Sequence, residues 1–212
     1  MRGNNTCLGV VLAGGLSSRM GQNKAQLLHP KQQNMLSFSS ALLTDVGVDG
    51  VVQSIGYNTQ PTGANQIADK YPNLGPLGGI ATVFETTPHV HSYLILPVDL
   101  PLLSAQCLSQ LKQVGQLSQM ACHFSDHYLP LYLPRTAMTE LFFQNLKTSQ
   151  ANASKLTTKK DKSLSIRQLL KQIQHRAIGL DRAHQQQLFN CNTAEQWQQA
   201  TNQLTLRVND YE

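Results

Sequence analysis

The sequence predicts an α/β fold, a three-layer sandwich in which helices cover both faces of one mostly parallel, twisted sheet. Short apolar runs alternate along the chain with segments whose apolar residues recur at helical spacing. This alternation is the pattern of βαβ units, which build parallel sheets. Glycine-rich and proline-rich loops follow two of the apolar runs, and open parallel sheets bind their ligands at such strand ends.

Five short apolar runs are the predicted strands of this sheet. They are Cys7 to Leu12, Gly50 to Ile55, Tyr93 to Pro97, Met120 to Phe124 and Ala177 to Leu180. The run Leu129 to Leu133 follows the fourth strand too closely for a crossover helix to fit between them. We therefore expect one antiparallel excursion in an otherwise parallel sheet.

The segments between these runs are predicted helices, because their apolar residues lie three or four positions apart. They are Met35 to Val46, Leu108 to Val114, Leu141 to Leu146 and Leu164 to Ile173. Further helices are expected over Ala81 to Glu85 and from Ala194, which follows the cap-like Thr193. The polar, lysine-rich stretch Thr148 to Ser163 predicts a mobile loop.

Length and composition limit the classes of function. A chain of 212 residues buries about 70% of its unfolded surface, and no repeat or interior linker stands out, so we expect one domain over residues 1–212. The net charge of +5 favours anionic partners. The basic residues are scattered and few aromatic residues accompany them, which is not the pattern of a nucleic-acid binder.

The cysteines and the apolar runs bear on cellular location. Cys7, Cys107, Cys122 and Cys191 show neither C-x-x-C pairing nor zinc-type spacing, and Cys7 and Cys122 are expected as small core side chains. The sequence shows no signal-peptide pattern and no apolar run near the ~20 residues of a membrane span. We therefore expect a cytoplasmic protein with no membrane partner.

The first candidate site is the loop after the first strand, V-V-L-A-G-G-L-S-S-R-M-G-Q-N-K. Gly14 and Gly15 let the backbone approach a phosphate and turn its N–H groups inward, while Arg19 and Lys24 can neutralise charge on phosphate oxygens. Its spacing fits neither a Walker loop nor G-x-G-x-x-G. The loop is either a nucleoside triphosphate site or a glycine-rich surface turn beside two solvated cations.

The second candidate is Asp99, in Y-L-I-L-P-V-D-L-P-L-L. Asp99 is the only charge in this stretch, and Pro97 and Pro101 restrict the backbone on either side of it. A carboxylate held at the end of a strand suits Mg²⁺, which takes one or two carboxylates together with substrate phosphates. The competing role is to cap the next helix, for which Ser104 is already well placed.

Two further stretches are candidates for ligand contacts, D-K-Y-P-N-L-G-P-L-G-G-I and F-N-C-N-T-A-E-Q-W. In the first, Gly78 and Gly79 open a helical pattern, whose N-terminus favours an anion; a plain turn into a helix is the alternative. In the second, Asn190 and Asn192 precede a helix and offer amide donors and acceptors; purely local capping is the alternative.

Together these stretches resemble the molybdenum cofactor guanylyltransferases, within the wider family of Rossmann-like nucleotidyltransferases. The resemblance is carried by L-A-G-G-x-S-x-R-M-G-x-x-K, G-P-L-G-G-I, P-V-D-L-P-L-L, S-L-S-I-R-Q-L-L and F-N-C-N-T-A-E-Q-W, in this order over nearly the whole chain. The first motif is shared across the wider family, whereas G-P-L-G-G-I and N-x-N-T are more specific. The resemblance implies a Rossmann-like sandwich.

The resemblance also implies a reaction: transfer of GMP from GTP to the phosphate of molybdopterin, with release of pyrophosphate and with Mg²⁺ as cofactor. The implied partners are GTP and molybdopterin, with cofactor-carrying and acceptor molybdoenzymes as candidate protein partners. Attack by one phosphate on another needs no strong base, because the nucleophile is already an anion. The alternatives are a cytidylyl or sugar-phosphate nucleotidyltransferase of the same fold, and a nucleotide-binding module without catalysis.

The site residues follow from the same resemblance. The catalytic set is Lys24, Arg19 and Asp99, with Asp99 also the metal ligand. The nucleotide-binding set is Leu12, Ala13, Gly14, Gly15, Lys24, Asp69 and Asp99. The molybdopterin-side set is Gly78, Gly79, Asn190 and Asn192. Retention of Lys24 and Asp99 at two separate strand ends disfavours a pure binding module.

Two regions depart from the family pattern. Ser54-Ile55-Gly56 stands where the family usually has an asparagine, with Asn58 late, so the sequence assigns no base contact there. His127 with Pro130-Leu131 only loosely matches a basic residue near a Pro-Leu pair, so the sequence assigns no residue to pterin binding there.

Gly14 matches the Leu-Ala-Gly-Gly of guanylyl members rather than the Leu-Ala-Ala-Gly of cytidylyl members. A missing Cβ there would leave room for a purine, which predicts that GTP is preferred to CTP and ATP.

Overall fold

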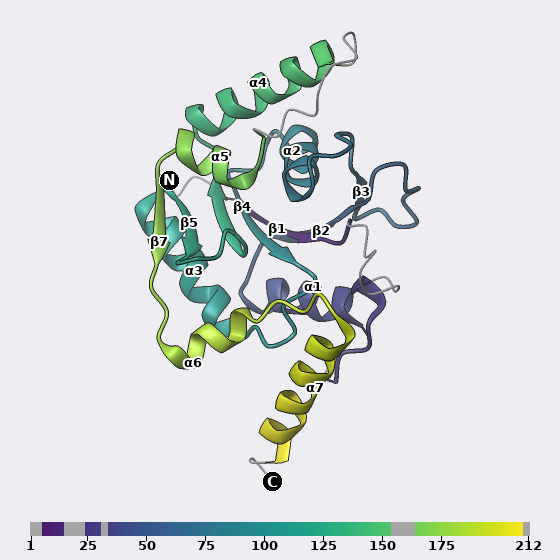
Figure 1. Ribbon diagram of the computed structural model, residues 1–212. Helices are drawn as coiled ribbons and strands as arrows, with labels where there is room; N and C mark the ends of the chain where they lie inside the picture. Colours follow the sequence, from purple (N-terminus) through teal and green to yellow (C-terminus); the bar gives the residue numbers. More distant parts are fainter. Residues whose placement is uncertain (1–5, 15–23, 31–33, 154–163, 210–212) are drawn as a thin grey trace.

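The computed structural model describes residues 6–14, 24–30, 34–153 and 164–209, and over these residues the chain alternates between strands and helices (Figure 1). The strands are β1 (Cys7–Leu12), β2 (Gly50–Ile55), β3 (Gln66–Ala68), β4 (Ser92–Pro97), β5 (Ala121–Phe124), β6 (Leu131–Pro134) and β7 (His175–Ile178). They form one sheet in the order β3-β2-β1-β4-β6-β5-β7. Every pairing that involves β6 is antiparallel and all others are parallel, which confirms the α/β fold and the predicted excursion.

Helices cover both faces of the sheet, as the sequence predicts. The helices are α1 (Met35–Asp45), α2 (Pro76–Thr86), α3 (Ala105–Ser118), α4 (Ala137–Ala153), α5 (Ile166–Gln172), α6 (Arg182–Gln185) and α7 (Ala194–Asn209), with 3₁₀ turns η1 (Lys24–Gln26) and η2 (Gln186–Leu188). Helices α2, α4 and α5 lie on one face, and α1 and α3 on the other (Figure 1). None of the helices in the described part of the chain is long and apolar enough to cross a membrane.

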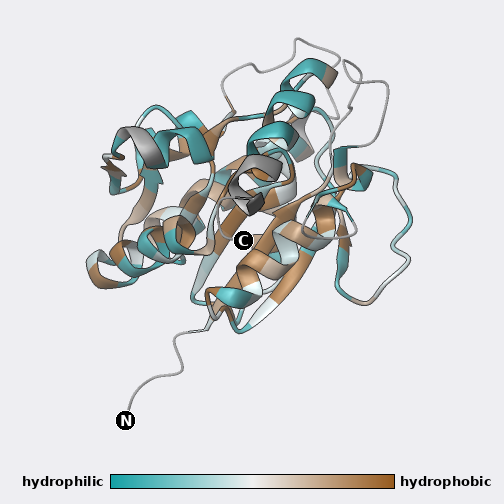
Figure 2. Ribbon diagram, turned by 90° about the horizontal axis from the view of Figure 1, so that it is seen from below, coloured by the Kyte–Doolittle hydropathy of each residue, from teal (hydrophilic) through white to brown (hydrophobic). Residues whose placement is uncertain are grey.

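Two hydrophobic clusters fill the space between the sheet and these helices. One joins β1, β4 and β6 to Leu77 and Ile80 of α2 and to Phe142 of α4. The other packs side chains from the opposite face of the same strands against α1 and α3, and it includes Cys7 and Cys122, as expected. Figure 2 shows hydrophobic residues concentrated along the central strands and the helix surfaces that face them. Burial of this apolar surface is the main stabilising term of the fold.

The pairing register brings four strand ends to one edge of the sheet. Leu12 of β1 lies opposite both Ser54 of β2 and Pro97 of β4. Ile55 lies opposite Ala68, so the end of β3 joins them. Because β6 runs antiparallel to β4, its beginning rather than its end reaches the same edge. The loops after β1, β2, β3 and β4 and the loop before β6 therefore meet.

Some predicted elements differ from the structure. Strand β3 was not predicted, because three residues with one large apolar side chain, Ile67, carry no periodicity. Helix α6 was also missed, for the same reason of shortness. The prediction of a loop from Thr148 is wrong as far as Ala153, since α4 continues to that residue. Gln150, Ala151 and Ala153 favour the helix, and Phe142, Phe143 and Leu146 anchor its inner face. The remainder of the predicted loop, 154–163, lies outside the described residues.

Candidate active site

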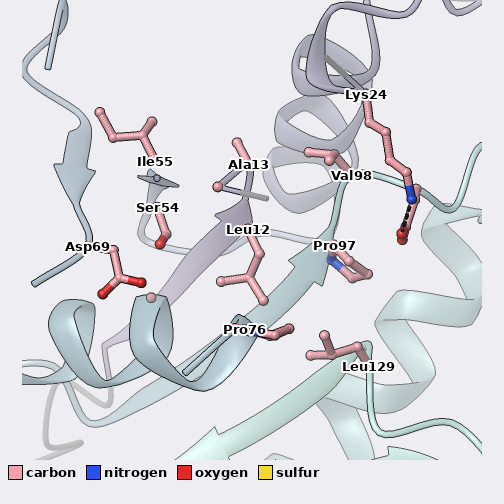
Figure 3. A pocket seen from close by; sticks show the side chains of 14 residues that line it. Leu12, Ala13, Lys24, Ser54, Ile55, Asp69, Pro76, Pro97, Val98 and Leu129 are labelled. Carbon is pink, nitrogen blue, oxygen red and sulfur yellow. Dashed lines mark hydrogen bonds and ion pairs between the residues drawn. The ribbon is translucent and has the colours of Figure 1, made fainter. Parts of the chain in front are cut away.

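An open cleft of about 240 Å³ lies at the sheet edge where the strand ends meet (Figure 3). We call it the first cleft. Its lining residues are Leu12, Ala13, Gly14, Lys24, Ser54, Ile55, Asp69, Gly75, Pro76, Gly79, Pro97, Val98, Asp99 and Leu129. Most of the predicted nucleotide-binding residues are therefore brought together in one place. Gly15 and Arg19 belong to the same predictions but lie outside the described residues.

After β1 the backbone is hydrogen-bonded to the end of β2. The backbone N–H groups of Ala13 and Gly14 both donate to the carbonyl oxygen of Ser54, at 2.9 Å each. A Cβ on Gly14 would lie 2.7 Å from Gly56 N and 2.8 Å from the carbonyl carbon of Ile55. Glycine at position 14 is thus required by the packing of two loops. The N–H and the missing side chain of Gly14 serve that packing, whereas the sequence suggested that they serve the ligand.

Asp69 follows β3 and is held in place by neighbouring groups. Its Oδ1 accepts hydrogen bonds from Tyr71 N at 2.7 Å and from Thr82 Oγ1 at 3.1 Å. Burial raises the pKa of the Asp69 carboxyl, although these two hydrogen bonds oppose the rise. Figure 3 shows Asp69 and Ser54 on the same side of the first cleft.

Gly78 and Gly79 allow α2 to lie directly against Asp69 and Ser54. A Cβ on Gly78 would lie 2.7 Å from Asp69 Oδ2, and a Cβ on Gly79 would overlap Ser54 Oγ. Both glycines lie inside α2, after the N-terminal Pro76 and the N-cap Gly75. The structure therefore places Gly78 against Asp69 and Gly79 against Ser54, and Gly79 lines the first cleft. Neither glycine lines the second cleft, to which Asn190 belongs.

Lys24 and Asp99 form the charged end of the first cleft. Lys24 Nζ donates to Asp99 Oδ2 at 3.1 Å and to Asn192 Oδ1 at 2.6 Å. The side chains of Lys24 and Asp99 are each 17% exposed. The other carboxylate oxygen of Asp99, Oδ1, is buried and has no hydrogen-bond partner among the described residues. Three predicted residues from distant parts of the chain are thus in direct contact.

The loop that carries Asn192 is fixed by a capping box at the start of α7. Gln196 Oε1 accepts from Asn192 N at 2.7 Å and from Thr193 N at 3.1 Å, and Gln196 N donates to Thr193 Oγ1 at 3.3 Å. Asn192 Nδ2 donates to Asn190 Oδ1 at 3.1 Å, which directs Asn192 Oδ1 toward Lys24. A backbone hydrogen bond also joins this loop to the loop after β4, because Cys191 N donates to Asp99 O at 2.9 Å.

A second cleft, of about 480 Å³, adjoins the first. Its lining residues are Leu74, Pro76, Leu77, Pro97, Asp99, Leu100, Asp126, His127, Tyr128, Leu129, Ser165, Ile166, Arg167 and Asn190. The two clefts share Pro76, Pro97, Asp99 and Leu129, so Asp99 lies at their junction. His127, which the sequence left without a role, and Asn190 both belong to the second cleft.

Several residues of the site were missed by sequence reasoning. Arg167 lies in the quoted S-L-S-I-R-Q-L-L motif, but only the packing of α5 against the sheet brings it to the second cleft. Gln196 was missed although T-A-E-Q places a glutamine three residues after a threonine cap, which is a readable capping-box signal. Ser104 caps α3 by accepting from Cys107 N, as expected, so Asp99 is not needed for that cap.

The arrangement is suited to a phosphorylated ligand and a divalent cation. Lys24 supplies positive charge, and Asp99 supplies a carboxylate with one oxygen not engaged by the described residues. Those residues contain no group of three or more histidine, cysteine, aspartate or glutamate side chains placed to hold a metal ion. Burial raises the pKa of Cys191 to about 12, so its thiol stays neutral beside Asp99 at physiological pH.

Comparison with known proteins gives matches over most of the chain. Residues 9–164 match the family described as the MobA-like NTP transferase domain. A molybdenum cofactor guanylyltransferase of Xanthomonas euvesicatoria pv. vesicatoria (strain 85-10) is 38% identical over 189 residues, which span 89% of this chain and 91% of that relative.

Solved structures share the fold. The molybdopterin-guanine dinucleotide biosynthesis protein A of Archaeoglobus fulgidus superposes with a TM-score of 0.64 at 15% identity, over 93% of this chain and 98% of that one. The Rv0371c protein of Mycobacterium tuberculosis H37Rv, in complex with manganese, superposes with a TM-score of 0.59 at 17% identity, with the same two shares covered. At these identities the two likenesses support the fold.

Proposed function

Since the chain belongs to the MobA-like NTP transferase family, we propose that it transfers GMP from GTP to the phosphate of molybdopterin. A phosphate oxygen of the acceptor forms a bond to the α-phosphorus of GTP, the α–β anhydride bond breaks, and pyrophosphate leaves. The observation that carries this proposal is the shared position of Asp99 between two clefts. An acid at such a junction lies where two bound substrates would meet.

The first cleft is the proposed GTP site. Figure 3 shows Asp69 at one end of the cleft and Lys24 at the other. We assign the guanine base to the Asp69 end, because a carboxylate can accept the adjacent N–H donors of guanine. The phosphates then lie at the end of Lys24 and Asp99, with backbone from Leu12 to Gly14 between the two ends. Gly15 and Arg19 remain proposed phosphate contacts.

Asp99 is the proposed ligand of a divalent cation, which we take to be Mg²⁺. Its buried Oδ1 has no hydrogen-bond partner among the described residues, as suits an oxygen that a cation engages. Mg²⁺ needs only one or two carboxylates when phosphates and waters complete its shell. When bound, it neutralises charge on the phosphate oxygens; Lys24 adds to that neutralisation, and no protein group has to act as a strong base.

The second cleft is the proposed molybdopterin site. Arg167 offers a planar, bidentate partner for the acceptor phosphate, and Asn190 offers amide groups for the pterin. Asn192 contacts Lys24 from the same loop, so it joins the two clefts. We reassign Gly78 and Gly79 from the molybdopterin side to the nucleotide side, because they lie against Asp69 and Ser54.

The remaining assignments follow from this reaction. Residues 1–212 are proposed as a single nucleotidyltransferase domain, since strands from both ends of the described chain share one sheet. The proposed location is the cytoplasm, which suits four cysteines that are all buried and free. Molybdoenzymes that accept the product are proposed protein partners.

The test is pyrophosphate release with molybdopterin and each of GTP, CTP and ATP in turn. We expect GTP to be used far better, because the half-buried carboxylate of Asp69 would lose its guanine donors with another base; such mismatches reach factors of ~10⁴. A matched control replaces Asp69 by Asn, which should reduce the preference. Equal rates with GTP and CTP would contradict the guanylyl assignment and leave a nucleotidyltransferase of broader base choice.

A further inference from the structure

Two oxygen ligands already converge on one cation in the first cleft. Lys24 Nζ lies 3.1 Å from Asp99 Oδ2 and 2.6 Å from Asn192 Oδ1. A carboxylate and an amide oxygen are hard donors of the kind that Mg²⁺ and Mn²⁺ prefer. The ammonium group of Lys24 therefore lies where a divalent cation would be coordinated by the same two oxygens.

The contact is shielded and incomplete. Lys24 and Asp99 are each 17% exposed, so bulk water screens their attraction only in part. Lys24 engages one carboxylate oxygen, while Asp99 Oδ1 is buried without a hydrogen-bond partner among the described residues. An unsatisfied buried oxygen is unfavourable, and a cation that engaged it directly or through a water would relieve that cost.

We propose that Lys24 is a gate: it holds the cation position at Asp99 while the cleft is empty and yields it when a polyphosphate arrives. A divalent cation and the ammonium cannot both lie beside Asp99, because like charges a few ångströms apart repel strongly away from bulk water. The polyphosphate gives Lys24 a new anionic partner, which frees the carboxylate. Metal and polyphosphate therefore bind together, and the metal alone binds weakly.

The local structure suits a side chain that changes partners over a fixed backbone. Lys24 begins η1, where Leu27 N donates to its carbonyl oxygen at 3.2 Å, and the next residue, Ala25, is buried. Beyond this anchored backbone the lysine has a flexible four-carbon stem and a compact charge. Asn192, held by Gln196 and Asn190, keeps its oxygen in position whether Lys24 is present or has moved.

The inference deepens the proposed function and rests on it only for the identity of the polyphosphate as GTP. Its test is Mn²⁺ binding by electron paramagnetic resonance, first without any nucleotide. Lys24→Met removes the charge and keeps the stem, and Lys24→Gln does the same with a polar end. We expect both neutral variants to bind Mn²⁺ about tenfold more tightly than the parent protein, within the usual range of site coupling. The charge-preserving control Lys24→Arg should stay close to the parent.

Two further measurements locate the effect. Combining Lys24→Met with Asp99→Asn should abolish the gain, and Mn²⁺ should raise the melting temperature of Lys24→Met more than that of the parent protein. Adding GTP should strengthen Mn²⁺ binding more in the parent than in Lys24→Met, because only in the parent does an ammonium group leave Asp99 when the nucleotide binds.

Equal Mn²⁺ affinity of the parent and both neutral variants, without nucleotide, would overturn the inference. A gain that survives Asp99→Asn would do so as well, since the metal would then bind elsewhere. These results are independent of base choice: a protein that used CTP as well as GTP would contradict the guanylyl assignment and leave the gate intact.

Discussion

At the scale of single residues, the site depends on two carboxylates in different surroundings. Asp99 pairs with Lys24, whereas Asp69 accepts from a backbone N–H and a hydroxyl and has no ion-pair partner among the described residues. Burial raises the pKa of Asp69 above the ordinary 3.8, so the folded state favours its protonated form relative to the unfolded chain. Protonated Asp69 therefore adds to the free energy of unfolding below the ordinary pKa, and this contribution is lost as the pH rises through the raised pKa of the folded state.

The raised pKa of Asp69 leads to a prediction for nucleotide binding. The ionised carboxylate is the better acceptor for guanine, so GTP affinity should fall on acidification, at a pH above the ordinary pKa of an aspartate. Asp69→Asn should bind GTP about tenfold less tightly near pH 7, as expected for a lost charged hydrogen bond, and the two proteins should converge in acid. Calorimetry over a pH series measures the ratio, and circular dichroism confirms folding at each pH. A ratio that stays constant with pH would show that Asp69 does not read the base as a carboxylate.

At the scale of elements, glycines set how closely helices approach the sheet. Gly78 and Gly79 let α2 touch Asp69 and Ser54, and Gly115 does the same for α3 against β6. A Cβ on Gly115 would fall within the ring of Tyr132, which is buried and 2% exposed. Tyr132 belongs to the hydrophobic cluster that includes α1 and α3, so moving its ring would disturb that packing. The close approach of α3 to β6 therefore favours glycine at this position.

Gly115→Ala should therefore destabilise the fold although alanine is the better helix former. We expect a loss of about 1–3 kcal/mol from overpacking, reduced by the helix propensity of alanine, which is worth up to ~1 kcal/mol. Urea unfolding measures the change. Gly179→Ala is the matched control, because a Cβ there would meet nothing within 4 Å, and its effect should stay within about 0.5 kcal/mol. A stabilised Gly115→Ala would mean that α3 can shift away from β6 at little cost.

At the scale of the whole molecule, the site is built from two parts of one sheet. Strands β1 to β4 and α2 supply the first cleft, while α5, the loop before β6 and the loop before α7 complete the second. The antiparallel direction of β6 makes this possible, because it carries Leu129 to the same edge as the ends of β1 and β4. The proposed substrates are thus held by separate parts that meet at Asp99.

This division predicts that the two substrates can be uncoupled. Arg167→Ala should raise the KM for molybdopterin about tenfold, as expected for the loss of a charged hydrogen bond, and should leave GTP affinity unchanged. Lys171→Ala removes an exposed positive charge from the same helix and is the control for non-specific electrostatics. Initial rates at varied molybdopterin and GTP separate the two constants. Equal losses for both substrates would contradict the assignment of the second cleft to the acceptor.

Much of the fold and part of the site could be predicted from the sequence. Apolar periodicity located β1, β2, β4 and α1, since strand and helix patterns are local properties of the chain. The motifs also placed Lys24, Asp99 and Asn192 among the functional candidates. Short elements such as β3 carry too few residues for a pattern, and the length of α4 depends on an inner face that only packing defines.

The sequence by itself determined which residues end the strands and which of them carry charge, because both are local properties of the chain. The tertiary structure decided which of these residues touch: Lys24 and Asn192 are 168 positions apart, and only the sheet register and the capping box of α7 join them. It also decided why Gly14 is a glycine, since the backbone it approaches belongs to another loop. Contacts between distant segments depend on the packing of the whole chain, and no local pattern encodes them.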